Sequence, residues 1–349
     1  MCGGKSAEHL VSLVSARTVL ANIDPKKYEA ELVFIDSKGR WLSADPKRLT
    51  SSVATKEVDV ARGSKELVPT QKLSGASRPD VVFPVLHGPM GEDGTIQGLF
   101  ELAGVPYVGC GVLGSAVGMD KEFTKLLAEK AGLPVLPWGA IHDPKEAPVL
   151  AKRLGYPVFV KPARMGSSVG VSKVRNPGQL AKAVKAAFRF DDKVLIEKGV
   201  NAREIEVAVL GDPYAKRGDP LMLSCSVVGE IIPNADFYDY KTKYLDPDRA
   251  KLAIPAPISK SQAETVWRLA ARAFWALDLY GMARVDFLMD KKGGKLWFNE
   301  ANTIPGFTAA SMYPLLWREA GVPTPELIDR LIRLAVRRQK ARARLKTTP

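Results

Sequence analysis

Apolar and polar positions along residues 6–118 follow a pattern that predicts strands separated by helices. The runs ELVFI, DVVFPVL and VPYVG predict strands, whereas GTIQGLFELAG has the spacing of a helix. Such alternation is typical of an α/β layer built on a mostly parallel sheet. Residues 37–66 are polar and rich in turn formers, so we expect an excursion over the surface there.

Two further regions follow, and each mixes helices with strands. A helix is predicted from Asp120 to Gly132, and Pro134 follows it. The segment YPVFVK predicts a strand, NPGQLAKAVKAAF a helix and KVLIEK another strand. The last region begins near REIEVAVLGD and contains a helix predicted from Gln262 to Leu279. It leads into two apolar runs, ARVDFLMD and KLWFNEAN.

These two runs flank KKGG, an order that predicts a β-hairpin. Side chains alternate between the faces of a strand, so Arg284 and Asp286 share one face of the first strand. Glu300 and Asn302 likewise share one face of the second. A loop of residues 292–294 would place Asp286 opposite Glu300. The same register would place Arg284 opposite Asn302.

Facing carboxylates repel each other, so this register predicts a cation between Asp286 and Glu300. Carboxylate and amide oxygens are the ligands that Mg²⁺ accepts, usually together with substrate phosphates. The alternative is that one of the carboxylates points to water or pairs with Lys295. We favour the magnesium interpretation because two carboxylates, an amide and a guanidinium fall on one inferred face.

The segment VFVKPARMGSSVGVSKV contains a strand, a loop of small residues and a second strand. Gly166 and Gly170 would let the backbone approach a ligand closely. Ser167 and Ser168 would add hydrogen-bond donors. Lys161, at the end of the first strand, would place an ammonium over the same ligand. The alternative is a plain turn, but the magnesium-ready hairpin later in the chain favours phosphate binding.

A further strand end, in VLIEKGVNAREIEV, carries Glu197 and Lys198, and Glu204 follows after a short loop. A carboxylate there could accept hydrogen bonds from ribose hydroxyls, and the strand-end backbone could contact an adenine edge. The alternative is that this Glu-Lys pair is simply solvated.

Composition places the chain among ordinary soluble globular proteins, with 349 residues, 46% hydrophobic and 26% charged. No apolar segment approaches the ~20 residues that a membrane span requires. The first residues, MCGGKSAEHL, lack the pattern of a signal peptide. Cys2, Cys110 and Cys225 are scattered and without CxxC spacing, which argues against disulfides or zinc and favours a cytoplasmic location.

The formal net charge of +13 raises the alternative of a nucleic-acid-binding protein. Much of this charge lies in residues 330–349, RLIRLAVRRQKARARLKTTP, which contain no acidic residue. Basic residues at a helix C-terminus complement the helix dipole and are usually solvated. Because no aromatic residues are interleaved with these charges, we expect no nucleic-acid partner.

Taken together, the motifs resemble those of the D-alanine–D-alanine ligase family, which are ATP-grasp enzymes, over nearly the whole chain. The matching segments are GGKSAEH, LHGPMGEDGTIQG, GMDKEFTK, KPARMGSSVGVSK, EKGVNAREIEVAVLG, FYDYKTKYLD, GMARVDF, NEANTIPGFT and ASMYP. The resemblance implies an N-terminal, parallel-sheet, Rossmann-like α/β domain (1–118) followed by a two-domain α+β ATP-grasp fold. Its central subdomain would span 119–212 and its C-terminal subdomain 213–336, with a lid loop at about 234–256 and a basic tail at 337–349.

The resemblance also implies a reaction, its cofactors and its partners. ATP would phosphorylate the carboxylate of one D-alanine, and the amine of a second D-alanine would attack the acylphosphate. The products would be D-alanyl-D-alanine for peptidoglycan synthesis, ADP and phosphate. Two Mg²⁺ or Mn²⁺ ions would act with ATP, and the protein would be a cytoplasmic homodimer.

Individual roles follow from the resemblance, position by position. Glu8 would hold the ammonium of the first D-alanine with Ser167 and Tyr244 as hydrogen-bonding partners, and Arg284 would stabilise the oxyanion of the tetrahedral intermediate. The other substrate contacts implied are His87, Ser311 and Met312. The implied ATP-binding residues are Lys121, Lys161, Ser168, Glu197, Lys198, Glu204 and Lys243. The implied metal ligands are Asp286, Glu300 and Asn302.

Two features depart from the family pattern, and a third feature, in the lid, distinguishes between acceptor substrates. Only Met1 and Cys2 precede Gly3 where members have a full strand, so either the start codon is misassigned or the first sheet is opened near Glu8. Leu10 replaces an acidic residue, which bears on substrate affinity. In the lid, Lys243 and Tyr244 resemble the members that accept D-alanine.

Two rival functions stay open at this point. One is a related ligase with D-lactate or D-serine as the acceptor. The other is a basic nucleic-acid-binding or non-catalytic nucleotide-binding protein.

Overall fold

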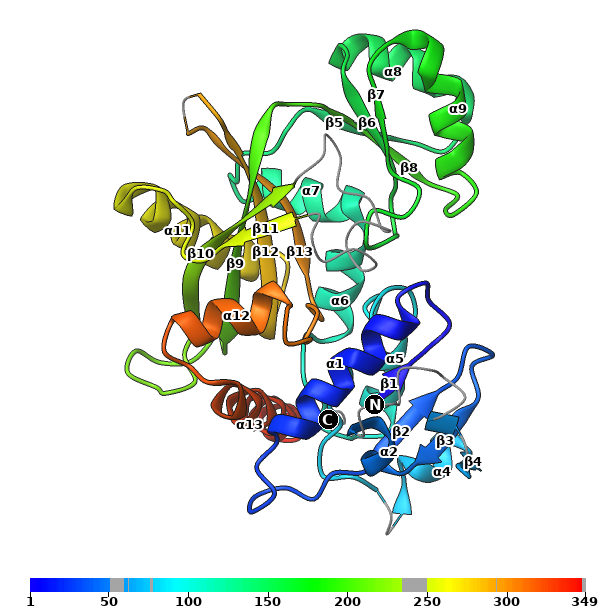
Figure 1. The fold of residues 1–349 in the computed structure, drawn as a ribbon, viewed down its shortest axis with the longest axis vertical. Helices are drawn as coiled ribbons and strands as arrows, with labels where there is room; N and C mark the ends of the chain where they lie inside the picture. Colours follow the sequence, from blue (N-terminus) through cyan, green and yellow to red (C-terminus); the bar gives the residue numbers. More distant parts are fainter. Residues whose placement is uncertain (51–59, 62, 76–77, 234–249, 293, 347–349) are drawn as a thin grey trace.

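The computed structural model of the chain describes residues 1–50, 60–61, 63–75, 78–233, 250–292 and 294–346. It contains three β-sheets with helices packed around them (Figure 1). In this view the four-stranded sheet of the central region lies above the five-stranded sheet, and the N-terminal region lies below. The structure is therefore a mixed α/β fold, as predicted.

The N-terminal region contains a mixed sheet, which corrects the prediction of a mostly parallel one. The elements are β1 (Cys2–Gly3), α1 (His9–Asn22), β2 (Leu32–Ile35), β3 (Trp41–Ala44), α2 (Pro46–Thr50), β4 (Lys65–Leu67), α4 (Pro69–Lys72), α5 (Thr95–Leu102) and α6 (Val112–Met119). The sheet order is β1-β2-β3-β4, with β1 parallel to β2 and the other two pairs antiparallel.

A tight turn between β2 and β3 explains this antiparallel pairing. Asp36 accepts hydrogen bonds from the main-chain nitrogens of Lys38 and Arg40, at 3.0 and 2.8 Å. Gly39 adopts a φ of +87°, which glycine tolerates best. A connection this short can only join antiparallel strands, because a parallel pair needs a long crossover.

The strand β1 is short, but neighbouring segments are hydrogen-bonded along both of its sides. Cys2 pairs with Phe34 of β2 and is fully buried. On the other side, the main chain of Met1 donates to the carbonyl of Phe83 (2.9 Å) and accepts from the nitrogen of Val85 (3.0 Å). The expectation of a sheet opened near Glu8 is therefore wrong.

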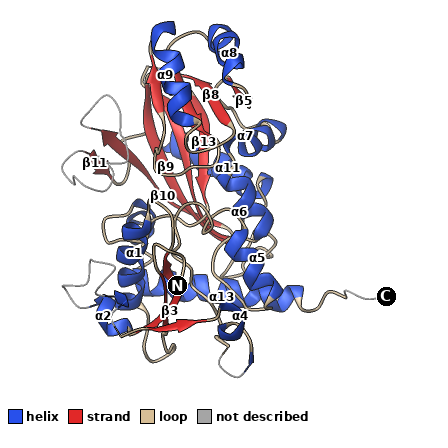
Figure 2. Cartoon of the chain, turned by 90° about the vertical axis from the view of Figure 1, so that its right-hand side faces the viewer, coloured by secondary structure: helices blue, strands red, loops and turns tan. Residues whose placement is uncertain are grey.

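The central region builds its own sheet and its own core. Its elements are α7 (Lys121–Lys130), β5 (Trp138–Ile141), the 3₁₀ turn η2 (Pro144–Glu146), α8 (Ala147–Leu154), β6 (Val158–Pro162), β7 (Ser172–Val174), α9 (Pro177–Ala187) and β8 (Val194–Lys198). The strand order is β5-β8-β6-β7, with antiparallel pairs throughout. Apolar side chains of α8 and α9, such as Leu150 and Leu180, form a separate cluster with the strands. Figure 2 shows both helices at one end of the molecule and α1 and α13 toward the other.

The C-terminal region builds the largest sheet. Its elements are β9 (Ala202–Gly211), β10 (Ser224–Pro233), β11 (Ala250–Ala253), α11 (Lys260–Ala276), β12 (Gly281–Asp290), β13 (Leu296–Asn302), α12 (Met312–Glu319) and α13 (Thr324–Arg342). The antiparallel order is β11-β10-β9-β12-β13. Although β9 falls inside the 119–212 range expected for the central subdomain, it pairs only within this sheet among the described strands.

The two faces of this sheet differ, and the difference positions the site. One face packs Ile205 and Val207 of β9 in a cluster with α11. On the other face Ala208 and Leu210 pack in a cluster with α12 and Phe307. Toward the β9 N-terminus this second face carries charged residues instead of apolar ones. The face is therefore apolar at one end and charged at the other.

The N-terminal region and the end of the chain share one core. Phe34 of β2 and Leu13 of α1 belong to the same cluster as Tyr313 and Leu331. The basic end of α13 also contacts the N-terminal region: Arg342 forms an ion pair of 2.7 Å with Glu101. Part of the basic charge at the end of the chain thus forms ion pairs within the fold. None of the helices in the described part of the chain combines the length and apolar character that a membrane crossing requires.

Candidate active site

The hairpin predicted from the sequence is formed by β12 and β13, and it has the predicted pairs. Asp286 lies opposite Glu300, and Arg284 lies opposite Asn302. The turn that joins the two strands differs from the expected one. Asp290 donates to the carbonyl of Lys295 (2.8 Å), so the turn is longer than the predicted three residues.

A β-bulge restores the register. The pairing shifts between Asp286 and Phe287, because Phe287 lies opposite Phe298 and Asp286 lies opposite Glu300. Asn299 is thus the extra residue on β13. The longer turn and the bulge change the register by one residue in opposite directions, so their effects cancel at the charged end of the hairpin.

A further carboxylate, which the sequence analysis missed, lies on the neighbouring strand. Asp286 pairs on its other side with Glu206 of β9. The Glu206 Oε2 atom lies 3.0 Å from Arg284 Nε. The alternation of Glu204, Ile205 and Glu206 in REIEV, with charged side chains on one face, was the signal for this residue.

Arg284 is held in place by two carboxylates, those of Asp286 and Glu206. Its Nε and Nη2 donate to the two oxygens of Asp286, at 2.8 and 2.7 Å. Burial by itself would lower the pKa of Arg284, but attraction to Asp286 and Glu206 outweighs burial and holds it well above its usual range. The guanidinium is therefore a fixed positive charge.

The predicted metal ligands form an oxygen-rich group beside Arg284. Asn302 Nδ2 donates to Asp286 Oδ2 at 2.9 Å, and Glu300 Oε2 lies 3.9 Å from Lys121 Nζ. Within the described ranges, no group of three or more His, Cys, Asp or Glu side chains is arranged to hold a metal ion. Two carboxylates and an amide fit a magnesium ion whose other ligands are phosphates and water.

Two lysines meet at one buried carboxylate. Glu197 accepts from Lys125 Nζ (2.5 Å) and from Lys161 Nζ (2.7 Å). Burial would raise the pKa of Glu197, but the two ammonium groups lower it to about 2. Lys125, fully buried on α7, was missed by the sequence analysis. The carboxylate of Glu197 is thus engaged by these two lysines, and its main chain is paired within the sheet between β5 and β6.

The other predicted nucleotide residues have differing surroundings. Lys121 Nζ donates to the carbonyl of Met165 at 2.7 Å, at the start of the glycine-rich loop. Lys198 Nζ donates to the carbonyl of Gly155 at 2.8 Å, so it fastens the end of β8 to the turn before β6. Glu204 is half-buried and raises the pKa of Lys161 together with Glu197 and Glu300, although burial opposes this. Lys243 lies outside the described residues.

Glu8 and Ser167 meet, as the resemblance implied. Ser167 Oγ donates to Glu8 Oε1, although the residues are 159 positions apart. A Cβ added to Gly166 would lie 3.0 Å from Glu8 Oε2, so this glycine lets the loop approach the carboxylate. Ser167 and Ser168 have φ values of +50° and +60°. Tyr244, their predicted third partner, lies outside the described residues.

Glu8 lies at the start of the first helix. The helix α1 begins at His9, and Glu8 is its N-cap residue. The Glu8 side chain makes no capping hydrogen bond. It is directed toward Ser167 instead. Leu10 has an exposed fraction of 55%, so this departure from the family pattern lies at the surface of α1.

His87 was predicted to face the substrate, but both of its ring nitrogens have internal partners. Nδ1 lies 3.0 Å from the carbonyl of Ile304, and Nε2 lies 2.9 Å from Ser15 Oγ. Burial lowers the pKa of His87 more than nearby Glu8 raises it, so the ring is neutral. In this structure the imidazole fastens the segment after β13 to α1.

Ser311 and Met312 lie where that segment enters α12. Ser311 is the N-cap residue, and its Oγ accepts from the nitrogen of Thr308 at 3.0 Å. The Met312 side chain is buried in the core, with an exposed fraction of 5%. Only the main chain of Met312 is thus placed to contact a ligand.

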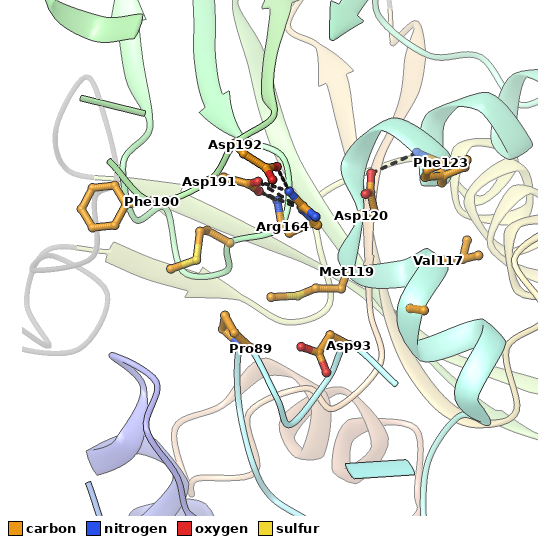
Figure 3. A pocket seen from close by; sticks show the side chains of 12 residues that line it. Pro89, Asp93, Val117, Met119, Asp120, Phe123, Arg164, Phe190, Asp191 and Asp192 are labelled. Carbon is orange, nitrogen blue, oxygen red and sulfur yellow. Dashed lines mark hydrogen bonds and ion pairs between the residues drawn. The ribbon is translucent and has the colours of Figure 1, made fainter. Parts of the chain in front are cut away.

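A cavity of about 590 Å³ has Asp120 and Met165 in its lining, which are the sequence neighbours of Lys121 and Gly166 (Figure 3). Pro89 and Asp93 lie at one side of it, and Arg164 with Asp191 and Asp192 lies at the other. Arg164 forms ion pairs with both aspartates. The cavity therefore lies between the N-terminal and central regions.

Comparison with known proteins agrees with this architecture. A family model described as "D-ala D-ala ligase N-terminus" matches residues 1–110, and one described as "D-ala D-ala ligase C-terminus" matches residues 127–333. A D-alanine–D-alanine ligase of Acetivibrio thermocellus is 45% identical, covering 96% of this chain and 94% of its own. D-alanine–D-alanine ligase A of Bradyrhizobium diazoefficiens is 47% identical, covering 98% and 95%.

Solved structures lead to the same family. The D-alanine–D-alanine ligase of Coxiella burnetii superposes with a TM-score of 0.83 at 34% identity, covering 98% of this chain and 94% of its own. The VanG D-Ala:D-Ser ligase of Enterococcus faecalis gives a TM-score of 0.82, also at 34% identity, covering 96% and 97%. On these matches over nearly its whole length, the chain belongs to the D-alanine–D-alanine ligase family of ATP-grasp enzymes.

Proposed function

We propose that this protein joins two molecules of D-alanine to D-alanyl-D-alanine, with ATP converted to ADP and phosphate, for peptidoglycan synthesis. The single observation that carries the proposal is the fixed Arg284, which is paired with Asp286 and Glu206 at the charged end of the five-stranded sheet. This arrangement suits a reaction in which negative charge develops beside a nucleotide.

Asp286, Glu300 and Asn302 are the proposed ligands for Mg²⁺ or Mn²⁺, with two ions acting alongside ATP. When bound, the ions neutralise the charge of the phosphates, which makes transfer of an anionic phosphoryl group feasible. The donor set of two carboxylates and an amide supports this assignment.

Glu8 is the proposed partner of the first D-alanine's ammonium. Ser167 orients the Glu8 carboxylate from the central region. Arg284 would stabilise the oxyanion when the second D-alanine attacks, because its position does not change as that charge develops. His87 would act indirectly, by holding the segment after β13 in position. Tyr244 would close the lid over this site.

The nucleotide would lie between the central and C-terminal regions. Lys121, Lys161 and Ser168 are the proposed phosphate contacts, and Lys243 is proposed to join them. Glu204 would accept hydrogen bonds from the ribose, while Glu197 would lie at the position of the adenine. Lys198 supports this strand end through its bond to the carbonyl of Gly155. The proposed domain boundaries lie at residues 118, 212 and 336, and the proposed location is the cytoplasm. The protein is also proposed to be a homodimer, which sedimentation analysis would test.

The acceptor amino acid is the main point on which a second candidate differs. One structural relative is named as a D-Ala:D-Ser ligase, so D-serine is the alternative acceptor. The pair Lys243 and Tyr244 in the lid sequence supports D-alanine. Ser311 and the main chain of Met312 are the proposed contacts for the acceptor's carboxylate.

Phosphate release from ATP and Mg²⁺, measured with D-alanine, D-serine, D-lactate and L-alanine, tests the proposal. We expect release with D-alanine, and mass spectrometry should identify the dipeptide. Arg284→Ala and Glu300→Gln should abolish it. Release that is independent of D-alanine would contradict the function, and unchanged turnover of Glu300→Gln would contradict the metal assignment alone.

A further inference from the structure

The loop after His87 carries a carboxylate to which the proposed reaction gives no role. Glu92 Oε2 accepts from the nitrogen of Gly88 at 2.7 Å, and Oε1 accepts from the nitrogen of Ile304 at 3.1 Å. Ile304 lies two residues after Asn302. Glu92 therefore joins the His87–Gly88 loop to the segment that runs from the proposed metal ligands to Ser311.

Glu92 lies close to Glu8, with Gly88 between them. The nitrogen of Gly88 donates to Glu92, whereas a Cβ added to Gly88 would lie 2.8 Å from Glu8 Oε2. The carboxylates of Glu8 and Glu92 repel each other when both are ionised. The cation whose charge also acts on Glu92 is Arg284, which is already paired with Asp286 and Glu206.

The surroundings of Glu92 favour its neutral form. Burial, followed by repulsion from Glu8, raises the pKa of Glu92 to about 8, although the two backbone donors and Arg284 oppose this. The titratable groups facing it are Glu8, neutral His87, Arg284 and the Cys110 thiol, whose pKa burial raises to about 12. Burial and the neighbouring Glu8 thus favour the protonated form of Glu92 in the absence of substrate.

We propose that Glu92 is a positioning residue that releases its proton to solvent when the ammonium of the first D-alanine binds at Glu8, an inference that rests on the proposed function. The bound ammonium supplies the positive charge that lets both carboxylates be ionised. One proton leaves the Glu92 carboxyl group, and no other bond is made or broken. An ionised Glu92 accepts stronger hydrogen bonds from the main chain of Gly88 and Ile304. Binding of the first amino acid thereby attaches the segment between Asn302 and Ser311 more strongly to the loop that carries Glu92.

Calorimetry can count the released proton. D-alanine is titrated at pH 7 into protein saturated with Mg²⁺ and a non-hydrolysable ATP analogue, in two buffers with different ionisation enthalpies. We expect the wild type to release close to one proton more per chain than Glu92→Gln. Glu101→Gln is the control: Glu101 pairs with Tyr107 and Arg342, and this variant should release as many protons as the wild type. Equal release by the wild type and Glu92→Gln would overturn the proposal.

The failure of this inference is distinguishable from failure of the proposed function. If D-alanine is not a substrate, the wild type and Glu101→Gln will show no heat of binding. If only the role of Glu92 is wrong, D-alanine will bind and the release will not depend on residue 92.

A second measurement needs neither ligand nor activity. The folded pKa of Glu92 lies above its ordinary value of 4.5, so the unfolded chain binds fewer protons between pH 4.5 and about 8. The free energy of unfolding of the wild type should therefore fall, relative to Glu92→Gln, as the pH rises through this window. Parallel curves for the two proteins would show that Glu92 is ionised throughout and would overturn the inference.

Discussion

The hydroxyl of Ser167 donates a hydrogen bond to Glu8, and this contact joins two parts of the chain that belong to different cores. Glu8 precedes α1, whose apolar face packs with the C-terminal helices, whereas Ser167 follows β6 of the central sheet. The proposed ammonium site is therefore completed only when the central and N-terminal regions are correctly placed.

Removing this hydroxyl should weaken binding of the amino acid. A hydrogen bond to a charged group contributes about 1.5–3 kcal/mol, so Ser167→Ala should raise the KM for D-alanine about 10- to 150-fold. Steady-state phosphate release gives this value. Ser172→Ala, at the start of β7, is the control and should stay within about twofold of the wild type. An unchanged KM in Ser167→Ala would show that this contact does not orient Glu8 for substrate.

A methyl group at Gly88 should disturb Glu8 directly. Gly88 has a φ of +80°, and an added Cβ would lie 2.8 Å from Glu8 Oε2. Gly321 has a similar φ of +85° with no atom within 4 Å of such a Cβ. Both Gly→Ala variants should lose about 1 kcal/mol of stability through backbone strain, but only Gly88→Ala should lose activity with D-alanine. Denaturant unfolding and the phosphate assay separate the two effects. Equal activity in the two variants would contradict a crowded Glu8.

The β12–β13 hairpin shows how much of the site a local pattern can predict. Alternation places Asp286 opposite Glu300, and the structure has this pair. The predicted three-residue loop is wrong, yet the bulge at Asn299 compensates for it. A bulge depends on how a strand packs against its neighbours, which the sequence of the hairpin itself does not specify. The roles assigned to these residues stay predictions.

Contacts between distant segments are what the pattern could not predict. Glu206 reaches Arg284 only because β9 lies next to β12, an order that follows from the whole sheet. Lys125 and Glu197 are 72 positions apart, and nothing in either segment alone indicates their pairing. The mixed first sheet is different, because the Asp36 turn was visible in the sequence as a hairpin signal.

The buried pair of Lys125 and Glu197 should contribute strongly to stability. Both side chains have exposed fractions of 2%, so removing one charge leaves the other with less compensation in a poorly solvated place. Lys125→Met keeps the volume and should lower the free energy of unfolding by about 3 kcal/mol. Lys130→Met, on an exposed position of the same helix, should change it by less than about 0.5 kcal/mol. Urea denaturation measures both. Equal effects in the two variants would contradict a stabilising buried pair.

The same pair should make the difference in stability between the wild type and Lys125→Met depend on pH. The folded pKa of Glu197 is about 2, below its ordinary value of 4.5, so its contribution is fully present above pH 4.5 and is lost as the pH falls through about 2. In Lys125→Met only Lys161 lowers this pKa, so the variant has less stability to lose. The gap in unfolding free energy should therefore narrow as the pH falls below 4.5, whereas Lys130→Met should follow the wild type. Urea denaturation at pH 5.5, 4.5 and 3.5 measures the gap, and a constant gap would mean that Lys125 stabilises the fold without lowering the pKa of Glu197.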